Sequence, residues 1–122
     1  MTVRECYNLM QGDYDDVLER LLDEKRVQKF MLKFLNDESF YILKNELVIT
    51  HDYEKAFRAV HTLKGVAQTL GFTQLYQASV PLTDALRSAP YPDDLTSLFQ
   101  PIQDSYSKTV LALKQFRLEN GI

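Results

Sequence analysis

The spacing of the apolar residues constrains the fold of this chain most strongly, because it follows the helical period along almost the whole sequence. One face with the i, i+3, i+4 and i+7 spacing is formed by Val27, Phe30, Met31 and Phe34. The same period runs through residues 95–113. No alternation of apolar and polar residues continues for the length of a strand. The pattern therefore predicts an all-α protein.

Capping residues divide this pattern into separate helices. Asp37 and Asp52 can each cap a helix N-terminus, and Gly71 stands where a residue in the left-handed conformation can end one. The expected helices cover residues 13–22, about 27–34, a segment after 37 with Phe40, Leu43 and Leu47 inward, 53–70, 73–88 and about 95–118. Their connections are short, so neighbouring helices should pack antiparallel. We therefore predict an antiparallel up-and-down four-helix bundle core with additional short N-terminal helices, in a single domain over residues 1–122.

Four prolines test this assignment of helices. Pro90 and Pro92 fall between two expected helices and break the chain there. Pro81 and Pro101 instead fall inside expected helices, where a proline removes a backbone hydrogen bond. Each of these two prolines is expected to kink its helix or split it.

Charge and composition exclude several classes of protein. The formal net charge of −3 lacks the basic excess of a nucleic-acid-binding protein. No apolar run approaches the roughly 20 residues that cross a bilayer, and the first residues lack the regions of a signal peptide. Cys6 is the only cysteine, so no disulfide can form within the chain, and we expect it to be a bystander. We expect a cytoplasmic monomer that binds neither nucleic acid nor membrane.

A helical wheel of residues 53–70, at about 100° per residue, separates a buried stripe from an exposed face. The apolar stripe consists of Ala56, Ala59, Val60, Leu63, Ala67 and Leu70. His61 lies opposite its centre and is expected to be exposed at mid-helix. Its neighbours on that side are Glu54, Phe57, Arg58, Lys64, Gly65 and Gln68.

Two neighbours make His61 a candidate phosphoryl acceptor. Gly65 costs the helix about 1 kcal/mol relative to alanine, and its missing side chain leaves space one turn from the ring. Lys64 supplies a mobile cation suited to phosphate. Positioning and charge neutralisation supply most phosphoryl-transfer catalysis. The plain alternative is an ordinary surface histidine or a hydrogen-bonded core histidine, which spacing alone favours.

Other chemistries find less support in the sequence. His51 is ten residues from His61, and no HxxxH, HxxE or cysteine pair indicates a metal site, so we expect no bound metal. No strand-to-helix elbow presents a nucleophilic serine, and no glycine-rich loop indicates ATP binding.

The stretch HTLKGVAQTLGF, followed by LYQASVPLTDALR, resembles the histidine-containing phosphotransfer (HPt) domain of two-component phosphorelays. The family pattern is roughly His-x-Leu-Lys-Gly with Leu-Gly six and seven residues after the lysine. The positions that match it are His61, Leu63, Lys64, Gly65, Leu70 and Gly71, and Leu75, Leu82, Leu86 and Arg87 continue the match. The resemblance extends over about residues 13–87 and more loosely over the last helix.

This resemblance implies a phosphocarrier with a four-helix bundle core and no kinase activity of its own. His61 would be the phosphoacceptor, with Lys64 and Arg87 as nearby cations and Gly65 as the clearance residue. The partners would be receiver domains of response regulators or hybrid histidine kinases. Any Mg²⁺ would be held by receiver carboxylates, so the chain itself should need no cofactor.

Residues around the matched motif complete the expected partner-binding surface. Phe57 would belong to a small apolar patch around the histidine, although it fits an aromatic at the edge of the core equally well. Arg58 could meet acidic residues of a receiver, and Gln68 is either a contact or a solvated position. Thr83 occupies the position where many members carry a glutamate or glutamine hydrogen-bonded to the histidine ring. Pro81, two residues earlier, also departs from the family pattern.

Three functions remain open at this point. The first is a stand-alone phosphorelay intermediate, and the second is the phosphoacceptor domain of a larger histidine kinase. The third is an inactive HPt-like bundle that binds receivers without carrying phosphate. The departures at Thr83 and Pro81 favour the third function, whereas His61, Lys64 and Gly65 together favour the first two.

Overall fold

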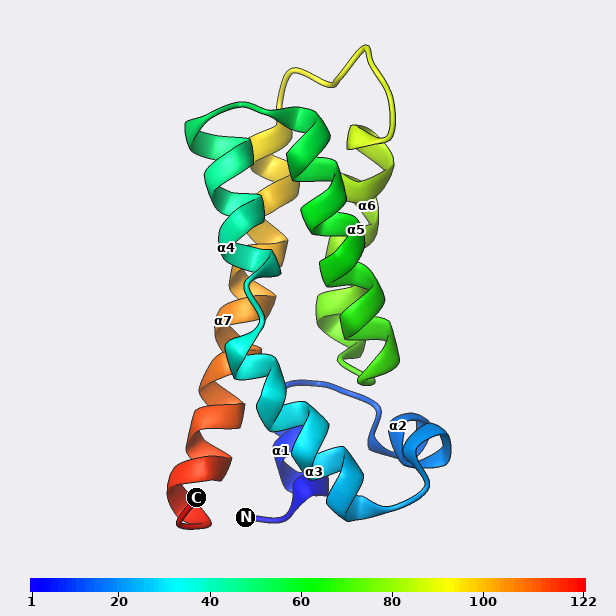
Figure 1. Cartoon of the computed structure of the whole chain (residues 1–122), viewed down its shortest axis with the longest axis vertical. Coiled ribbons are helices and arrows are strands. Elements are labelled where there is room, and N and C mark those ends of the chain that lie inside the picture. Colours follow the sequence, from blue (N-terminus) through cyan, green and yellow to red (C-terminus); the bar gives the residue numbers. More distant parts are fainter.

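The computed structural model describes residues 1–122 and contains only helices, which confirms the all-α prediction (Figure 1). The α-helices are α1 (Val3–Leu9), α2 (Tyr14–Leu21), α3 (Glu24–Lys33), α4 (Ser39–Lys44), α5 (Tyr53–Thr69), α6 (Thr73–Leu86) and α7 (Leu95–Glu119). A 3₁₀ turn, η1 (Phe34–Asn36), follows α3, and a π-helical segment, η2 (Asn45–Ile49), continues α4. None of the helices combines the length and the apolar composition needed to traverse a bilayer.

Four of the helices lie along the long axis of the molecule. Figure 1 shows α4, α5 and α6 beside the first half of α7, with the chain reversing between consecutive helices. Helix α5 packs against both α4 and α6, and α6 packs against α7. Helices α1, α2 and α3 gather at the other end, where α1 and α3 pack against α7. The long helix α7 therefore connects the two ends of the molecule.

Aspartate side chains begin four of the helices. Asp13, Asp23, Asp52 and Asp94 each accept a hydrogen bond from the backbone N–H three residues later. Each bond satisfies one of the N–H groups that a helix N-terminus leaves without a partner. The predicted cap at Asp52 is confirmed. The predicted cap at Asp37 is wrong by one residue, since Glu38 is the N-cap of α4 and makes no capping bond with its side chain, while Asp37 accepts a hydrogen bond from the Ser39 N–H at 2.8 Å.

The turn between α5 and α6 follows from Gly71. Its φ of 70° lies in the left-handed region. The N–H of Phe72 donates to the Ala67 carbonyl at 2.9 Å, which closes the helix end in the way a Schellman motif does. A Cβ at Gly71 would lie 2.7 Å from the Asp13 carbonyl oxygen, so the close approach of the N-terminal segment also requires glycine.

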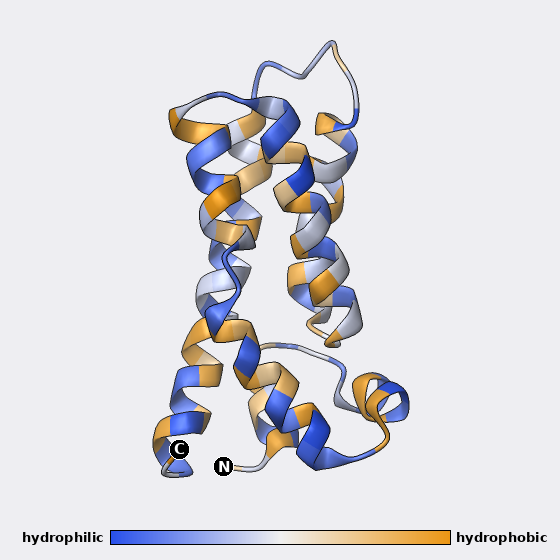
Figure 2. Ribbon diagram, viewed as in Figure 1, coloured by the Kyte–Doolittle hydropathy of each residue, from blue (hydrophilic) through white to orange (hydrophobic).

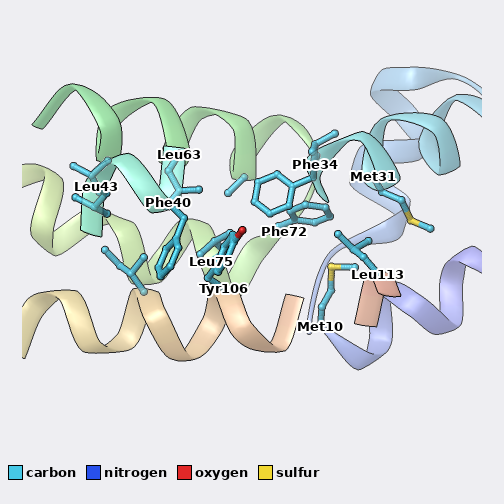
Figure 3. Packing of buried hydrophobic residues seen from close by; sticks show 14 of the residues in the cluster. Met10, Met31, Phe34, Phe40, Leu43, Leu63, Phe72, Leu75, Tyr106 and Leu113 are labelled. Atoms are coloured by element: carbon cyan, nitrogen blue, oxygen red, sulfur yellow. The ribbon is translucent and has the colours of Figure 1, made fainter. Parts of the chain in front are cut away.

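The buried hydrophobic residues form one continuous core. Figure 3 shows Phe34 beside Phe72 and Phe40 beside Tyr106 in this core. The Phe40 and Tyr106 rings stack with centroids 4.0 Å apart. Figure 2 shows hydrophilic and hydrophobic residues recurring in turn along the helices, as expected when each helix buries one face. The core connects the N-terminal helices to the four long-axis helices.

Three expectations about the elements need correction. Phe30 is 37% exposed, although its spacing predicted a buried position, because α3 buries only Val27 and Met31, and Phe34 is buried from the start of η1. Helices α6 and α7 continue through Pro81 and Pro101 without a split, since each proline removes only one hydrogen bond and is followed by a fully buried residue, and a kink at each proline stays a prediction. Helix α6 ends at Leu86, before the expected residue 88.

Candidate functional site

Helix α5 presents His61 to solvent at mid-helix, as the wheel predicted. Every residue of the predicted stripe is buried: Ala56, Ala59, Val60, Leu63, Ala67 and Leu70. His61, Thr62 and Gly65 are exposed. The burial of one stripe against α4 and α6 therefore fixes which face of α5 remains accessible.

On the side of α5 that faces α6, the His61 ring lies against Phe57. The two ring centroids are 5.8 Å apart and the planes are inclined at 30°. The guanidinium of Arg87, at the C-terminal end of α6, lies over the Phe57 ring at 5.6 Å from its centroid. Arg87 also pairs with Asp84 at 3.6 Å. The structure thus brings three predicted site residues together in a row that joins α5 to α6.

On the other side of His61, a groove of about 700 Å³ opens between α5 and the α3–η1 segment. His61 and Gly65 lie in this groove, and a Cβ at Gly65 would meet no atom within 4 Å outside its own helix. Its apolar and polar lining includes Phe30, Lys33, Asn36, Thr62, Val66 and Thr69. Sequence reasoning missed Phe30, Lys33 and Asn36, because only the tertiary arrangement brings α3 and η1 to the histidine. Thr62, Val66 and Thr69 lie on α5 itself, where their positions on the wheel were the available signal.

The remaining cations lie on either side of the histidine. Arg58 is exposed and lines a second hollow of about 300 Å³ between α4 and α5, together with Lys55 and Ile42. Lys64 is half-buried rather than fully exposed, and it lines neither hollow. On the wheel it falls on the same flank of α5 as Phe57. Gln68 is exposed two turns after His61.

Thr83 does not occupy the expected position at the surface. Its side chain is fully buried, and its hydroxyl donates to the Ser79 carbonyl of its own helix at 2.7 Å. The expectation that Thr83 contacts a partner is therefore wrong. Its short side chain is satisfied within α6, so it supplies no hydrogen bond that could replace the glutamate or glutamine of related proteins.

The single cysteine of the chain takes no part in this face. Burial raises the pKa of the Cys6 thiol to about 12, and its Sγ donates to the Ala112 carbonyl at 3.5 Å. The thiol is therefore protonated and covered, as expected of a bystander. Nowhere in the chain do three histidine, cysteine, aspartate or glutamate side chains converge as ligands for a metal ion.

Comparison with known families gives one match. The family model described as the Hpt domain matches residues 14–116, a span that begins at α2 and includes all of α5 and α6. No curated protein and no solved structure matches the chain.

Proposed function

The chain belongs to the Hpt domain family, and from this premise we propose that His61 accepts a phosphoryl group from one receiver domain and donates it to another. The observation that carries the proposal is the exposed imidazole at the middle of α5 with open space over Gly65. An acceptor must enter the active site of a second protein, and a ring covered by its own chain could not do so.

In the proposed reaction, an unprotonated ring nitrogen of His61 attacks the phosphorus of a receiver's aspartyl phosphate. A nitrogen–phosphorus bond forms as the bond from phosphorus to the aspartate oxygen breaks, and the aspartate leaves as a carboxylate. Donation to the next receiver is the same step in reverse. Mg²⁺ held by the receiver's carboxylates would neutralise charge on the moving group, so this chain is proposed to need no metal or cofactor.

The neighbouring residues have separate proposed roles. Lys64 and Arg87 offset the negative charge of the phosphorylated ring, since Lys64 falls on the same flank of α5 as Phe57 and Arg87, at the end of α6, lies over the Phe57 ring. Gly65 gives the partner room to approach. Arg58 and Gln68 contact the receiver, and Phe57 contributes apolar area. The groove residues Phe30 and Lys33 extend this surface onto α3.

The rest of the proposal concerns the molecule as a whole. We propose that α4 with η2, α5, α6 and the first half of α7 form the antiparallel four-helix bundle of a phosphocarrier. The alternating direction of these helices and the packing of α5 on both α4 and α6 support it. We further propose a monomer in the cytoplasm, without kinase activity of its own, whose partners are receivers of response regulators or hybrid kinases.

A transfer assay tests this function. The protein is incubated with a panel of phosphorylated receiver domains and Mg²⁺, and wild type is compared with His61→Gln and with His51→Gln as the matched control. We expect at least one receiver to lose its phosphoryl group to wild type and to His51→Gln but not to His61→Gln. Receivers that bind wild type without any transfer would instead identify an adaptor, the inactive alternative.

A further inference from the structure

The side chain that lies against the His61 ring comes from its own helix, one turn earlier. Phe57 and His61 have the i, i+4 spacing that places two residues on one face of a helix. Their centroid distance of 5.8 Å and inclination of 30° are within the range of attractive aromatic pairs. The imidazole is otherwise on an exposed face, where a side chain without contacts would move between rotamers.

Phe57 is itself held in place from two directions. It is half-buried and packs against the edge of the core. The Arg87 guanidinium covers its ring at 5.6 Å, a cation–π distance, and Asp84 holds that guanidinium from the preceding turn of α6 at 3.6 Å. Through this contact the end of α6 fixes an aromatic ring on α5.

Helix α6 offers no polar alternative at Thr83, whose hydroxyl is buried and directed to Ser79. We propose that Phe57 is a positioning residue for His61, with Arg87 holding the phenyl ring, so that the tilted aromatic contact orients the imidazole. This inference rests on the proposed function, because the orientation has a consequence only if His61 accepts a phosphoryl group.

A fixed orientation of the imidazole ring favours its role as a phosphoryl acceptor for a physical reason. Attack on phosphorus requires the ring nitrogen to lie in line with the bond that breaks, and a ring already held near this geometry loses less freedom on docking. Phe57 has no hydrogen-bonding group, so its contact leaves both ring nitrogens of His61 free to react. Replacement of the phenyl ring by an aliphatic side chain that keeps the apolar area for the receiver should therefore slow the chemical step without weakening receiver binding.

The test compares Phe57→Leu, which keeps apolar volume, with Phe57→Tyr, which keeps the ring. Transfer is measured against receiver concentration, and the imidazole protons of His61 are followed by NMR. We expect Phe57→Leu to lower the maximal transfer rate about tenfold with an unchanged half-saturating receiver concentration. The ring-current shift of His61 should disappear in the same variant. Phe57→Tyr should keep both the maximal transfer rate and the ring-current shift of His61 at their wild-type values.

Two controls accompany these variants. Thr83→Val removes a hydroxyl that does not face the ring, so the transfer rate and the His61 shift should stay at their wild-type values. His51, whose ring lies 6.2 Å from that of Tyr53, supplies a second imidazole signal that Phe57→Leu should leave unchanged. The wild-type spectrum tests the contact between the Phe57 and His61 rings without any substitution, so the inference can be refuted even if Phe57→Leu does not fold.

The possible results separate the two proposals. A wild-type rate in folded Phe57→Leu, or a wild-type His61 signal without a ring-current shift, overturns the positioning role. A raised half-saturating concentration with an unchanged maximal rate also overturns it, because Phe57 would then be a docking residue only. If wild type accepts no phosphoryl group from any receiver, the proposed function itself fails, whatever the spectrum shows.

Discussion

Gly65 illustrates, at the residue scale, how one absent side chain affects both stability and access. It occupies an ordinary helical position in α5, and a Cβ there would meet no atom within 4 Å outside its helix. Nothing in the fold therefore excludes a larger residue. The cost of glycine in a helix is about 1 kcal/mol relative to alanine, so a reason for glycine must be sought in the partner.

We expect Gly65→Ala to raise the free energy of unfolding by about 1 kcal/mol, because alanine restricts the unfolded chain and favours the helix. The melting temperature, measured by circular dichroism, should rise by about 4 °C. Gly65→Gln should also stabilise the helix yet block transfer, since its side chain enters the groove beside His61. Wild-type transfer by folded Gly65→Gln would show that the space over Gly65 is not used.

The sequence could predict exposure at this scale where the helical period decides it. The buried stripe of α5 and the exposed His61 follow from the position of each residue on one helix. The burial of Thr83 does not, since it depends on how α6 packs against its neighbours, and the half-burial of Lys64 was missed for a similar reason. The row that joins Arg87, Phe57 and His61 needs two helices in their final positions.

Helix α5, at the element scale, is fixed at both ends. Asp52 caps its N-terminus, and Arg20 of α2 donates to carbonyl groups in the last turn of its C-terminus. Arg20 Nη2 donates to the Gln68 and Thr69 oxygens at 2.8 and 2.9 Å, and its Nε donates to Thr69 at 3.2 Å. A cation at this end also favours the helix dipole. Helix α2 thus supports the helix that carries the histidine.

We expect Arg20→Gln to lower the free energy of unfolding by about 1 kcal/mol. This value is smaller than that of a buried hydrogen bond to a charged group, because Arg20 is partly exposed to solvent. Amide hydrogen exchange should accelerate in the last turn of α5. The matched control is Arg26→Gln, which removes only an exposed pair with Asp23 at 3.6 Å. Equal effects of the two substitutions on stability and exchange would mean that Arg20 does not support α5.

Local sequence signals predicted much of this element but not its tertiary contacts. Asp52 and Gly71 lie within a few residues of the helix ends that they determine, so their roles follow from short-range chemistry. Arg20 acts on carbonyl groups 48 and 49 residues away, and no local pattern records this contact. The groove between α3 and α5 was missed for the same reason.

The N-terminal helices, at the scale of the whole molecule, share one core with the long-axis helices. Tyr7 and Cys6 of α1 are fully buried, and the Tyr7 hydroxyl donates to the Leu70 carbonyl at 2.7 Å. The Asp13 N–H donates to the Gly71 carbonyl at 2.8 Å. These contacts connect α1 and the segment before α2 to the end of α5. We propose on this basis that the chain unfolds as one domain.

The reactivity of Cys6 should report this single transition. Burial raises the pKa of the thiol to about 12, so at neutral pH the reactive thiolate is almost absent from the folded protein. We expect labelling by an aromatic disulfide reagent to be negligible without denaturant and to increase with urea in parallel with the loss of helical circular dichroism. Labelling well before the helical signal falls would mean that α1 detaches separately.

The overall architecture could be predicted in part from the sequence. Periodicity and caps predicted the helical class and most helix bounds, because both act within one helix. The location of α1 was not predicted, since seven residues carry too little periodicity to define a helix. The available signal was its capping box. The Thr2 hydroxyl accepts a hydrogen bond from the Glu5 N–H, and the Glu5 carboxylate accepts one from the Thr2 N–H.

The most direct test of the central proposal is to locate the phosphoryl group on the protein after transfer from a phosphorylated receiver. The account predicts a label that is labile to acid and stable to alkali, as a phosphorylated imidazole is, and that peptide mass spectrometry assigns to His61. The label should be retained in His51→Gln and absent from folded His61→Gln. A label found on another residue, or one that persists after His61→Gln, would contradict the account.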